Sequence, residues 1–281
     1  MKIAVIGASG FLGKKLMDYF SKESLIVGTY SKNMMENMEH LDAADKNMVE
    51  DFLVKHKPDV VIDTAALTSS VACEKNPEIC EKMNYLTAKN IAEACRKINA
   101  KMIFISSSYV FDGKKGDYSE EEKPSHTNEY ARTKIMAEKE VSKLNNHLII
   151  RIEIIYGSIK GKIRFGNQIF GTEFVEVGYP EQTRNPLFVD DLPGIVDFLI
   201  RKNWKGIFHI GGPEKIKMID FLRELSKLEN SEDKIKVVDS SKWLVKPPKN
   251  PTLNISKINN LGIKTTSFED ALKKIKAEIK L

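Results

Sequence analysis

A glycine-rich segment, GASGFLG, begins at Gly7 and directly follows a short apolar run, KIAVI. Its glycines suit a strand–turn–helix junction that binds a dinucleotide: Gly7 permits a tight turn, Gly10 lets the backbone approach a pyrophosphate, and Gly13 allows close helix–strand packing. The helix that starts at Phe11 and Leu12 then directs free N–H groups at the phosphates. The spacing is GxxGxxG rather than the commoner GxGxxG, but it predicts the same kind of cofactor turn.

Short β-branched runs alternate with helical patterns along most of the chain. The strand-like runs cover residues 2–7, 25–30, 59–65, 101–106, 148–157 and 206–212. The helical patterns cover residues 11–22, 46–56, about 76–97, 129–144 and 190–202. Because the strands are continuously apolar, the pattern predicts an α/β fold of the Rossmann type, with a doubly wound parallel sheet buried by helices on both faces.

Two segments interrupt this alternation. Residues 158–185 are glycine-rich and irregular, and residues 212–281 follow a different pattern of a helix, a strand, a proline-containing loop and a final helix. We expect residues 1–157 to form the dinucleotide-binding Rossmann domain, with 186–211 returning to it. The two interrupting segments would then form a smaller C-terminal substrate-binding lobe.

Composition and charge argue against several other classes of protein. The net charge is +5, and lysines are interspersed with acidic residues, so we expect no nucleic-acid partner. No apolar stretch approaches the ~18 residues that a membrane span needs, and the first apolar run is too short for a signal peptide. Three cysteines form no CxxC and five histidines are scattered, which predicts a reduced, cytoplasmic protein without a metal.

The turn after the second predicted strand bears on the choice of cofactor. An acidic residue there would bind the 2′-hydroxyl of the NAD ribose. This chain has Ser31 and Lys32 instead, with no carboxylate in the turn. A hydroxyl and an ammonium suit a 2′-phosphate, so the sequence favours NADP(H), with NAD(H) as the alternative.

A second motif, EYARTK, places Tyr130 and Lys134 four residues apart on one helix face. Tyr85 and Tyr156 have the same spacing to a lysine, so the pair alone proves little. Only Tyr130 follows a strand end rich in hydroxyls, SSSYVFDG, which supplies Ser107. Because ligands bind beyond the carboxyl ends of parallel strands, we expect Ser107 to face Tyr130 and Lys134.

This trio suits the reduction of a ketone. A nearby ammonium lowers the pKa of a phenol from ~10 toward working pH, which makes the phenol a usable acid for a carbonyl that becomes an alkoxide. A serine hydroxyl would stabilise the same oxygen. The alternative is a buried serine and an exposed helix pair without catalytic roles.

The motifs GASGFLG, SSSYVFDG and YARTK together resemble the extended short-chain dehydrogenase/reductase superfamily. PDVVIDTAALT followed by ISSSYVFDG resembles the dTDP-4-dehydrorhamnose reductases, and RNPLFVDDL, GIFHIGG and LNISKINNLGI also resemble the related regulatory beta subunit of methionine adenosyltransferase. The resemblance implies that Ser107 hydrogen-bonds the reacting carbonyl and that Tyr130 donates the proton. It implies that Lys134 binds the nicotinamide ribose and tunes that tyrosine.

The resemblance implies further roles with simpler alternatives. Asp42 would contact adenine, or cap the helix that follows it. Ala65 and Ala66 would let the backbone pass close to the cofactor, or merely pack. Asn84 matches a helix asparagine of the family and is either functional or structural. Arg184 would hold a substrate phosphate bidentately, or form a surface ion pair.

Two positions depart from the reductase pattern where the substrate would be read. Ser108 stands where the reductases usually have Asp, and Ile154 stands where they carry an aromatic residue, typically Trp. We place both in the substrate site with Arg184. These departures concern the identity of the substrate and leave the residues of hydride transfer unchanged.

Three functions remain open. The first is an NADP(H)-dependent reductase that converts dTDP-4-dehydrorhamnose, a 4-keto nucleotide sugar, to dTDP-rhamnose, acting as a cytoplasmic homodimer. The second is a non-catalytic, dinucleotide-binding regulatory subunit, which Ser108 and Ile154 favour. The third is a nucleotide-sugar epimerase or dehydratase, although dehydratases usually add acidic residues where this chain has Ser108.

Overall fold

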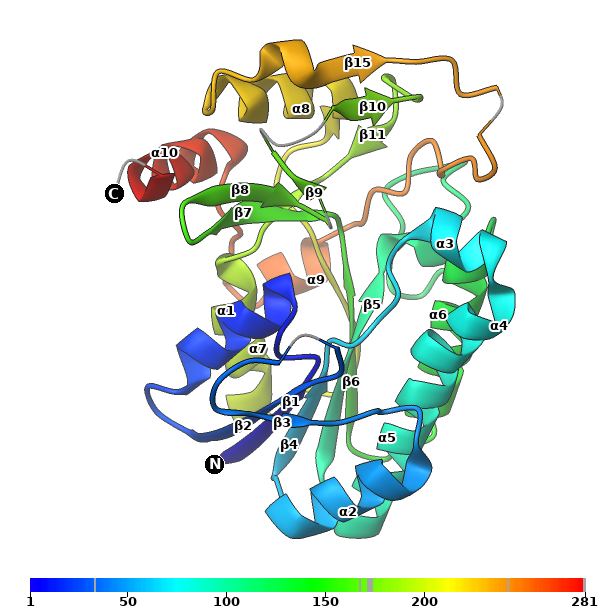
Figure 1. Cartoon of the computed structure of the whole chain (residues 1–281), viewed down its shortest axis with the longest axis vertical. Helices are drawn as coiled ribbons and strands as arrows, with labels where there is room; N and C mark the ends of the chain where they lie inside the picture. Colours follow the sequence, from blue (N-terminus) through cyan, green and yellow to red (C-terminus); the bar gives the residue numbers. More distant parts are fainter. Residues whose placement is uncertain (33, 167, 171–173, 242, 280–281) are drawn as a thin grey trace. The chain divides into compact units, whose positions relative to one another are not determined.

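The chain divides into two compact units in a computed structural model (Figure 1). The model describes residues 1–32, 34–166, 168–170, 174–241 and 243–279. The first unit comprises residues 1–106, 128–151 and 193–208. The second unit comprises residues 107–127, 152–192 and 209–281.

This partition differs from the predicted boundaries mainly in the segment 107–127, which the sequence placed in the Rossmann domain. The segment lies in the second unit because its backbone pairs with the C-terminal region. The N–H of Tyr118 donates to the carbonyl of Thr252 (2.9 Å), and the N–H of Asn254 donates to the carbonyl of Tyr118 (2.8 Å). Such long-range backbone pairing leaves no periodic signal in the sequence.

A seven-stranded sheet with the order β13-β6-β5-β4-β1-β2-β3 forms the centre of the first unit. Its strands are β1 (Lys2–Ile6), β2 (Leu25–Tyr30), β3 (Met38–His40), β4 (Val60–Asp63), β5 (Lys101–Ser107), β6 (His147–Ile152) and β13 (Gly206–Ile210). The strands from β3 to β5 pair in parallel. The chain leaves β1 toward β2 and later returns to the other side of β1 at β4, so the switch point lies at the carboxyl ends of β1 and β4.

Helices cover both faces of this sheet, with α1 and α7 on one face and α2, α5 and α6 on the other (Figure 1). The helices are α1 (Phe11–Phe20), α2 (Lys46–His56), α3 (Ser70–Lys75), α4 (Pro77–Cys80), α5 (Thr87–Ile98), α6 (Glu129–Val141) and α7 (Asp191–Arg201). Every residue of β4 is buried, as expected for a strand covered on both sides. The predicted doubly wound Rossmann-type fold is therefore confirmed.

Several predicted elements are wrong in detail. The helix predicted over residues 76–97 consists of α4, a π-helical segment (Glu81–Leu86) and α5. The strand predicted over residues 148–157 is two strands, β6 and β7, which are separated at Glu153. The Glu153 N–H donates to the carbonyl of Ile210 (3.1 Å), and its carboxylate accepts the N–H of Ile154 (2.9 Å). Beyond this point the chain pairs with β8 and β12 instead.

The second unit contains a four-stranded sheet with the order β12-β7-β8-β9 and two strand pairs, β10-β15 and β11-β14. Its strands are β7 (Ile155–Ile159), β8 (Lys162–Phe165), β9 (Gln168–Ile169), β10 (Val175–Val177), β11 (Thr183–Arg184), β12 (Leu187–Phe188), β14 (Ile216–Lys217) and β15 (Ile235–Val237). Its helices are α8 (Met218–Lys227), α9 (Ser256–Asn259) and α10 (Phe268–Ile279). Within residues 158–185 we expected a single strand, in the run EFVEVG, and β10 lies there; the other short strands of this segment were not predicted.

An aromatic cluster forms much of the core of the second unit. Tyr156 packs edge-on against Phe221 with 5.1 Å between ring centroids, and both side chains are buried. Phe165 and Phe188 belong to the same core. Among the helices that the structure describes, none has the length and apolar character that crossing a membrane requires.

Candidate active site

The glycine turn after β1 is tightly packed against backbone. Gly7 has a φ of +82°, and a Cβ on it would lie 2.9 Å from the nitrogen of Ala65. A Cβ on Gly13 would lie only 2.4 Å from the carbonyl oxygen of Gly7 and 2.7 Å from the Cα of Ala8. Gly10 is the N-cap of α1, and no side chain of the described residues caps this helix. The turn therefore has the shape expected for a phosphate-binding helix start.

We expect Gly13→Ala to destabilise the protein by about 1–3 kcal/mol, because the added methyl group meets rigid backbone atoms. Displacing α1 should also weaken NADPH binding. Urea unfolding and a fluorescence titration with NADPH would measure the two effects.

Gly194→Ala is the matched control. Gly194 lies within α7, and a Cβ there would meet only the Tyr19 hydroxyl at 3.9 Å, which is an ordinary contact. Alanine in a helix interior gains roughly 0.5–1 kcal/mol over glycine, so this variant should be as stable as the wild type or more so. Equal behaviour of the two variants would contradict the assigned role of Gly13.

The residues predicted to contact the adenosine end of the cofactor lie near the end of β2. Ser31 and Lys32 directly follow β2 and are exposed. Asp42 accepts the N–H of Ala44 (3.0 Å) and does not cap α2. The capping residue is Asp45, whose carboxylate accepts two N–H groups of the first turn. The capping alternative for Asp42 is thus wrong, and its contact with adenine stays a prediction.

Tyr130 and Lys134 lie one turn apart near the start of α6, as predicted. The helix begins after Asn128, whose side chain accepts the N–H of Ala131 (2.9 Å). Lys134 is only 2% exposed, and its ammonium donates to the carbonyl of Ile105 (2.7 Å). Burial lowers the pKa of Lys134 to about 8, so this lysine differs from one on a solvated helix face.

Ser107 is the last residue of β5. Its hydroxyl accepts the N–H of Tyr109 (3.2 Å) and so begins a 3₁₀ turn, Ser108–Val110. Ser107 belongs to the second unit, whereas Tyr130 and Lys134 belong to the first. The predicted approach of the serine hydroxyl to the tyrosine stays a prediction.

The two other tyrosines with a lysine four residues on have structural environments. The Tyr85 hydroxyl donates to Glu140 (3.4 Å). Tyr156 is 1% exposed within the aromatic core of the second unit, and burial raises its pKa. The distinction that we drew between these residues and Tyr130 therefore agrees with their packing.

The loop after β4 is held in place by Asn84, which lies in the π-helical segment. The Asn84 side chain accepts the N–H of Leu67 (2.7 Å), donates to its carbonyl (3.1 Å), and donates to the hydroxyl of Thr133 in α6 (3.2 Å). These bonds give Asn84 a structural role. The half-buried Ala65 and Ala66 begin the same loop, opposite the glycine turn.

The predicted substrate residues have unexpected partners. Arg184 is buried, and its Nε donates to the Glu153 carboxylate (2.7 Å) while an Nη donates to the Tyr109 hydroxyl (3.2 Å). Ser108 is fully buried, and its hydroxyl has no hydrogen-bond partner within the described residues. Ile154 is half-buried and packs against the aromatic core of the second unit. Arg184 thus forms a buried ion pair, in place of the surface pair that we considered.

Glu153 and Tyr109 were not among the site residues predicted from the sequence. The available signal was a carboxylate flanked by isoleucines in the run IEII, because buried charges are rarely left unpaired. Asp63, at the end of the apolar run DVVID, carries the same signal.

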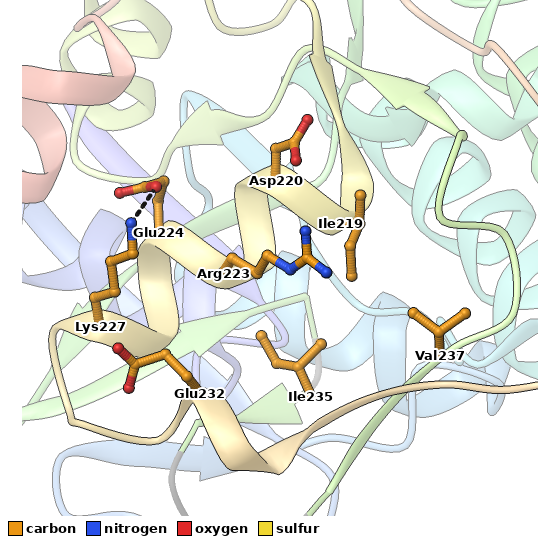
Figure 2. Close-up of a pocket in the computed structure, with 8 residues that line it drawn as sticks. All are labelled: Ile219, Asp220, Arg223, Glu224, Lys227, Glu232, Ile235 and Val237. Atoms are coloured by element: carbon orange, nitrogen blue, oxygen red, sulfur yellow. Dashed lines mark hydrogen bonds and ion pairs between the residues drawn. The ribbon is translucent and has the colours of Figure 1, made fainter.

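Figure 2 shows a groove of about 530 Å³ between α8 and β15 in the second unit. Its lining combines Ile235 and Val237 with charged side chains of α8, and Lys227 donates to Glu224 (2.6 Å). None of the predicted catalytic or cofactor residues lines this groove. We therefore do not place the reaction there.

The parallel sheet, the glycine turn after β1 and the Tyr130–Lys134 helix define the class of the protein as the extended short-chain dehydrogenase/reductase superfamily. The family model "RmlD substrate binding domain" matches residues 1–281, and the chain belongs to this family.

Relatives of this chain include a subunit of methionine adenosyltransferase and dTDP-4-dehydrorhamnose reductases. Methionine adenosyltransferase 2 subunit beta of Mus musculus is 28% identical over 290 residues, which cover 97% of this chain and 86% of the relative. The crystal structure of a dTDP-4-dehydrorhamnose reductase from Clostridium acetobutylicum has 25% identity and a TM-score of 0.86, with all of both chains covered. The corresponding reductase from Bacillus anthracis, in complex with NADP, has 24% identity, a TM-score of 0.85 and 99% coverage of each chain.

Proposed function

We propose that the protein is an NADP(H)-dependent reductase of a 4-keto nucleotide sugar, with dTDP-4-dehydrorhamnose as the substrate and dTDP-rhamnose as the product. The observation that carries this proposal is the buried ammonium of Lys134, one helical turn from Tyr130. A buried lysine with a lowered pKa is expensive to maintain, and such groups concentrate at functional sites.

The assigned chemistry follows from these residues. Bound NADPH would supply the hydride to the C4 carbonyl of the sugar. Tyr130 would donate a proton to the carbonyl oxygen, and the Ser107 hydroxyl would hydrogen-bond that same oxygen. The Lys134 ammonium would bind the nicotinamide ribose and favour release of the tyrosine proton.

The preference for NADP(H) over NAD(H) rests on Ser31 and Lys32, which are exposed after β2 with no carboxylate beside them in the turn. The glycine turn, Asp42, Ala65 and Ala66 would complete the cofactor site. Structural neighbours were solved with NADP or with NAD, which supports a nicotinamide dinucleotide cofactor.

A second candidate is a regulatory subunit that binds a dinucleotide without catalysis. It is favoured by the buried Arg184–Glu153 pair, because an arginine neutralised in this way is less available to a substrate phosphate. The 28% sequence identity to methionine adenosyltransferase 2 subunit beta also favours this candidate.

The decisive experiment incubates the purified protein with dTDP-4-dehydrorhamnose and either NADPH or NADH, and follows cofactor oxidation together with the sugar product. Oxidation of NADPH with formation of dTDP-rhamnose supports the proposal. Conversion of a nucleotide sugar without net cofactor oxidation would indicate an epimerase or dehydratase.

No oxidation across a panel of 4-keto nucleotide sugars would remove the reductase assignment. Retrieval of a methionine adenosyltransferase whose rate changes on binding would then support the regulatory alternative. The predicted homodimer is checked on the same preparation by light scattering, and the cytoplasmic location by cell fractionation.

A further inference from the structure

Strand β4 ends in a buried carboxylate that the proposed mechanism does not use. Asp63 is 1% exposed, at the end of the otherwise apolar VVID strand. Its Oδ1 accepts the N–H of Ala65 (3.0 Å), whereas its Oδ2 has no hydrogen-bond partner within the described residues. An ionised carboxylate in such a place is costly unless a cation lies near.

The geometry identifies the cation as Lys134. Asp63 is the neighbour of Phe104 across β4 and β5, and neighbouring residues of paired strands direct their side chains to the same face of a sheet. The Lys134 ammonium lies 3.9 Å from the centroid of the Phe104 ring and bonds the next carbonyl, that of Ile105. The carboxylate and the ammonium therefore share one face of the sheet beneath α6.

Each charge opposes the effect of burial on the other. Burial raises the pKa of Asp63 to about 6, and the Lys134 charge works against this rise. Burial lowers the pKa of Lys134 to about 8, and Asp63 is the foremost of the anions that work against that fall. Between these two values both groups are ionised, and the ammonium is retained at neutral pH.

Three other titratable groups lie near this pair. Glu138, one turn beyond Lys134, is bound to Arg151 of β6 (2.7 and 3.0 Å). Cys95 of α5 faces Asp63, and burial raises the pKa of this thiol. Cys80 of α4 faces Lys134, and its thiol shares a hydrogen bond with the Thr133 hydroxyl (3.4 Å).

We propose that Asp63 is a positioning residue that keeps Lys134 protonated at the floor of the cofactor site, and that it acts on Tyr130 through this lysine. The effect of Asp63 on catalysis through Tyr130 rests on the proposed reductase function. The interaction between the charges of Asp63 and Lys134 lies within the first unit, which also holds Tyr130.

Asp63→Asn tests the proposal, because the amide keeps the shape of the carboxylate and its oxygen can still accept the Ala65 N–H. Without the carboxylate, burial lowers the pKa of Lys134 further, so the ammonium is lost at a lower pH. We expect the alkaline limb of the kcat/KM profile to move down by about one pH unit, with roughly a tenfold loss of rate on that limb. Hydrogen bonding to Cys73 lowers the pKa of the Cys80 thiol, so the profiles are compared in a Cys80→Ser background.

Asp59→Asn is the control. Asp59 directly precedes β4 at its opposite end, is exposed, and accepts the N–H of Lys2 (2.7 Å). This variant removes the same charge and should leave the profile unmoved. An Asp63→Asn profile that superimposes on the wild type would overturn the proposal.

A second measurement does not depend on activity. With ¹³C-labelled lysine, the NMR titration of Lys134, assigned through Lys134→Arg, should have a midpoint near pH 8 in the wild type and a lower midpoint in Asp63→Asn. A wild-type Lys134 that titrates near the ordinary ~10.4 would refute the proposal even if Asp63→Asn does not fold. If the protein reduces no nucleotide sugar but the two midpoints differ as expected, only the proposed function has failed.

Discussion

Replacement of Tyr130 by phenylalanine should reduce kcat by ~10²–10⁴-fold, which is the usual contribution of a positioned general acid. The ring stays in place, because Tyr130 is buried near the start of α6 and phenylalanine fills the same volume apart from the hydroxyl. NADPH affinity should therefore stay close to the wild-type value. Steady-state rates and a fluorescence titration with NADPH measure the two quantities on one preparation.

Tyr85→Phe is the matched control for this experiment. It removes a phenol that also has a lysine four residues on, but whose hydroxyl donates to Glu140. Its kcat should remain within a factor of about two of the wild type, because this hydroxyl lies outside the proposed site and its lost hydrogen bond is worth only about 1 kcal/mol in stability. Near-normal turnover in Tyr130→Phe would remove this residue as the proton donor.

The largest expected effect on stability comes from the buried ion pair between Arg151 and Glu138. The Arg151 guanidinium is 2% exposed and donates to both carboxylate oxygens of Glu138, which also accepts the Ser106 hydroxyl (2.5 Å). Arg151→Met should reduce the free energy of unfolding by about 3–5 kcal/mol, because it leaves a carboxylate buried without its cation. Urea unfolding of the two proteins measures this difference.

The double variant Arg151→Met/Glu138→Leu distinguishes the loss of a charge partner from a loss of packing. It removes both charges and should recover most of the stability lost in the single variant. Arg201→Met is a surface control: its side chain is 54% exposed in its pair with Asp197, so the loss of this pair should change the free energy of unfolding far less. A loss of similar size in both single variants would contradict the assigned cost of the buried pair.

The pair also positions the catalytic helix. Glu138 lies on α6, one turn beyond Lys134, and Arg151 lies on the neighbouring strand β6. Arg151→Met should therefore lower activity as well as stability, whereas the more stable double variant should regain part of that activity.

Much of the fold could be predicted because its signals are local. The bounds of β2 and α2 agree with the predicted ranges, because β2 begins with an apolar run, LIV, and Asp45 caps the start of α2. The elements that we did not predict correctly depend on distant partners. The break between β6 and β7 depends on the pairing of β7 with β8 and β12, and the placement of segment 107–127 depends on the backbone near Thr252.

The candidate site divides in the same way. The glycine turn and the Tyr130–Lys134 pair could be predicted because turn geometry and the helical repeat fix them over a few residues. The partners of Arg184 could not, because Glu153 and Tyr109 reach it from other parts of the chain.

The sequence by itself determined the class of fold, the position of the cofactor turn and the helix that presents a phenol beside an ammonium. Only the tertiary structure decided which charges are buried and what they face: Asp63 with Lys134, Glu138 with Arg151, and Glu153 with Arg184. The physical reason is that periodicity and turn geometry act over a few residues. The energy of a buried charge instead depends on the groups that folding brings around it in a low-dielectric interior.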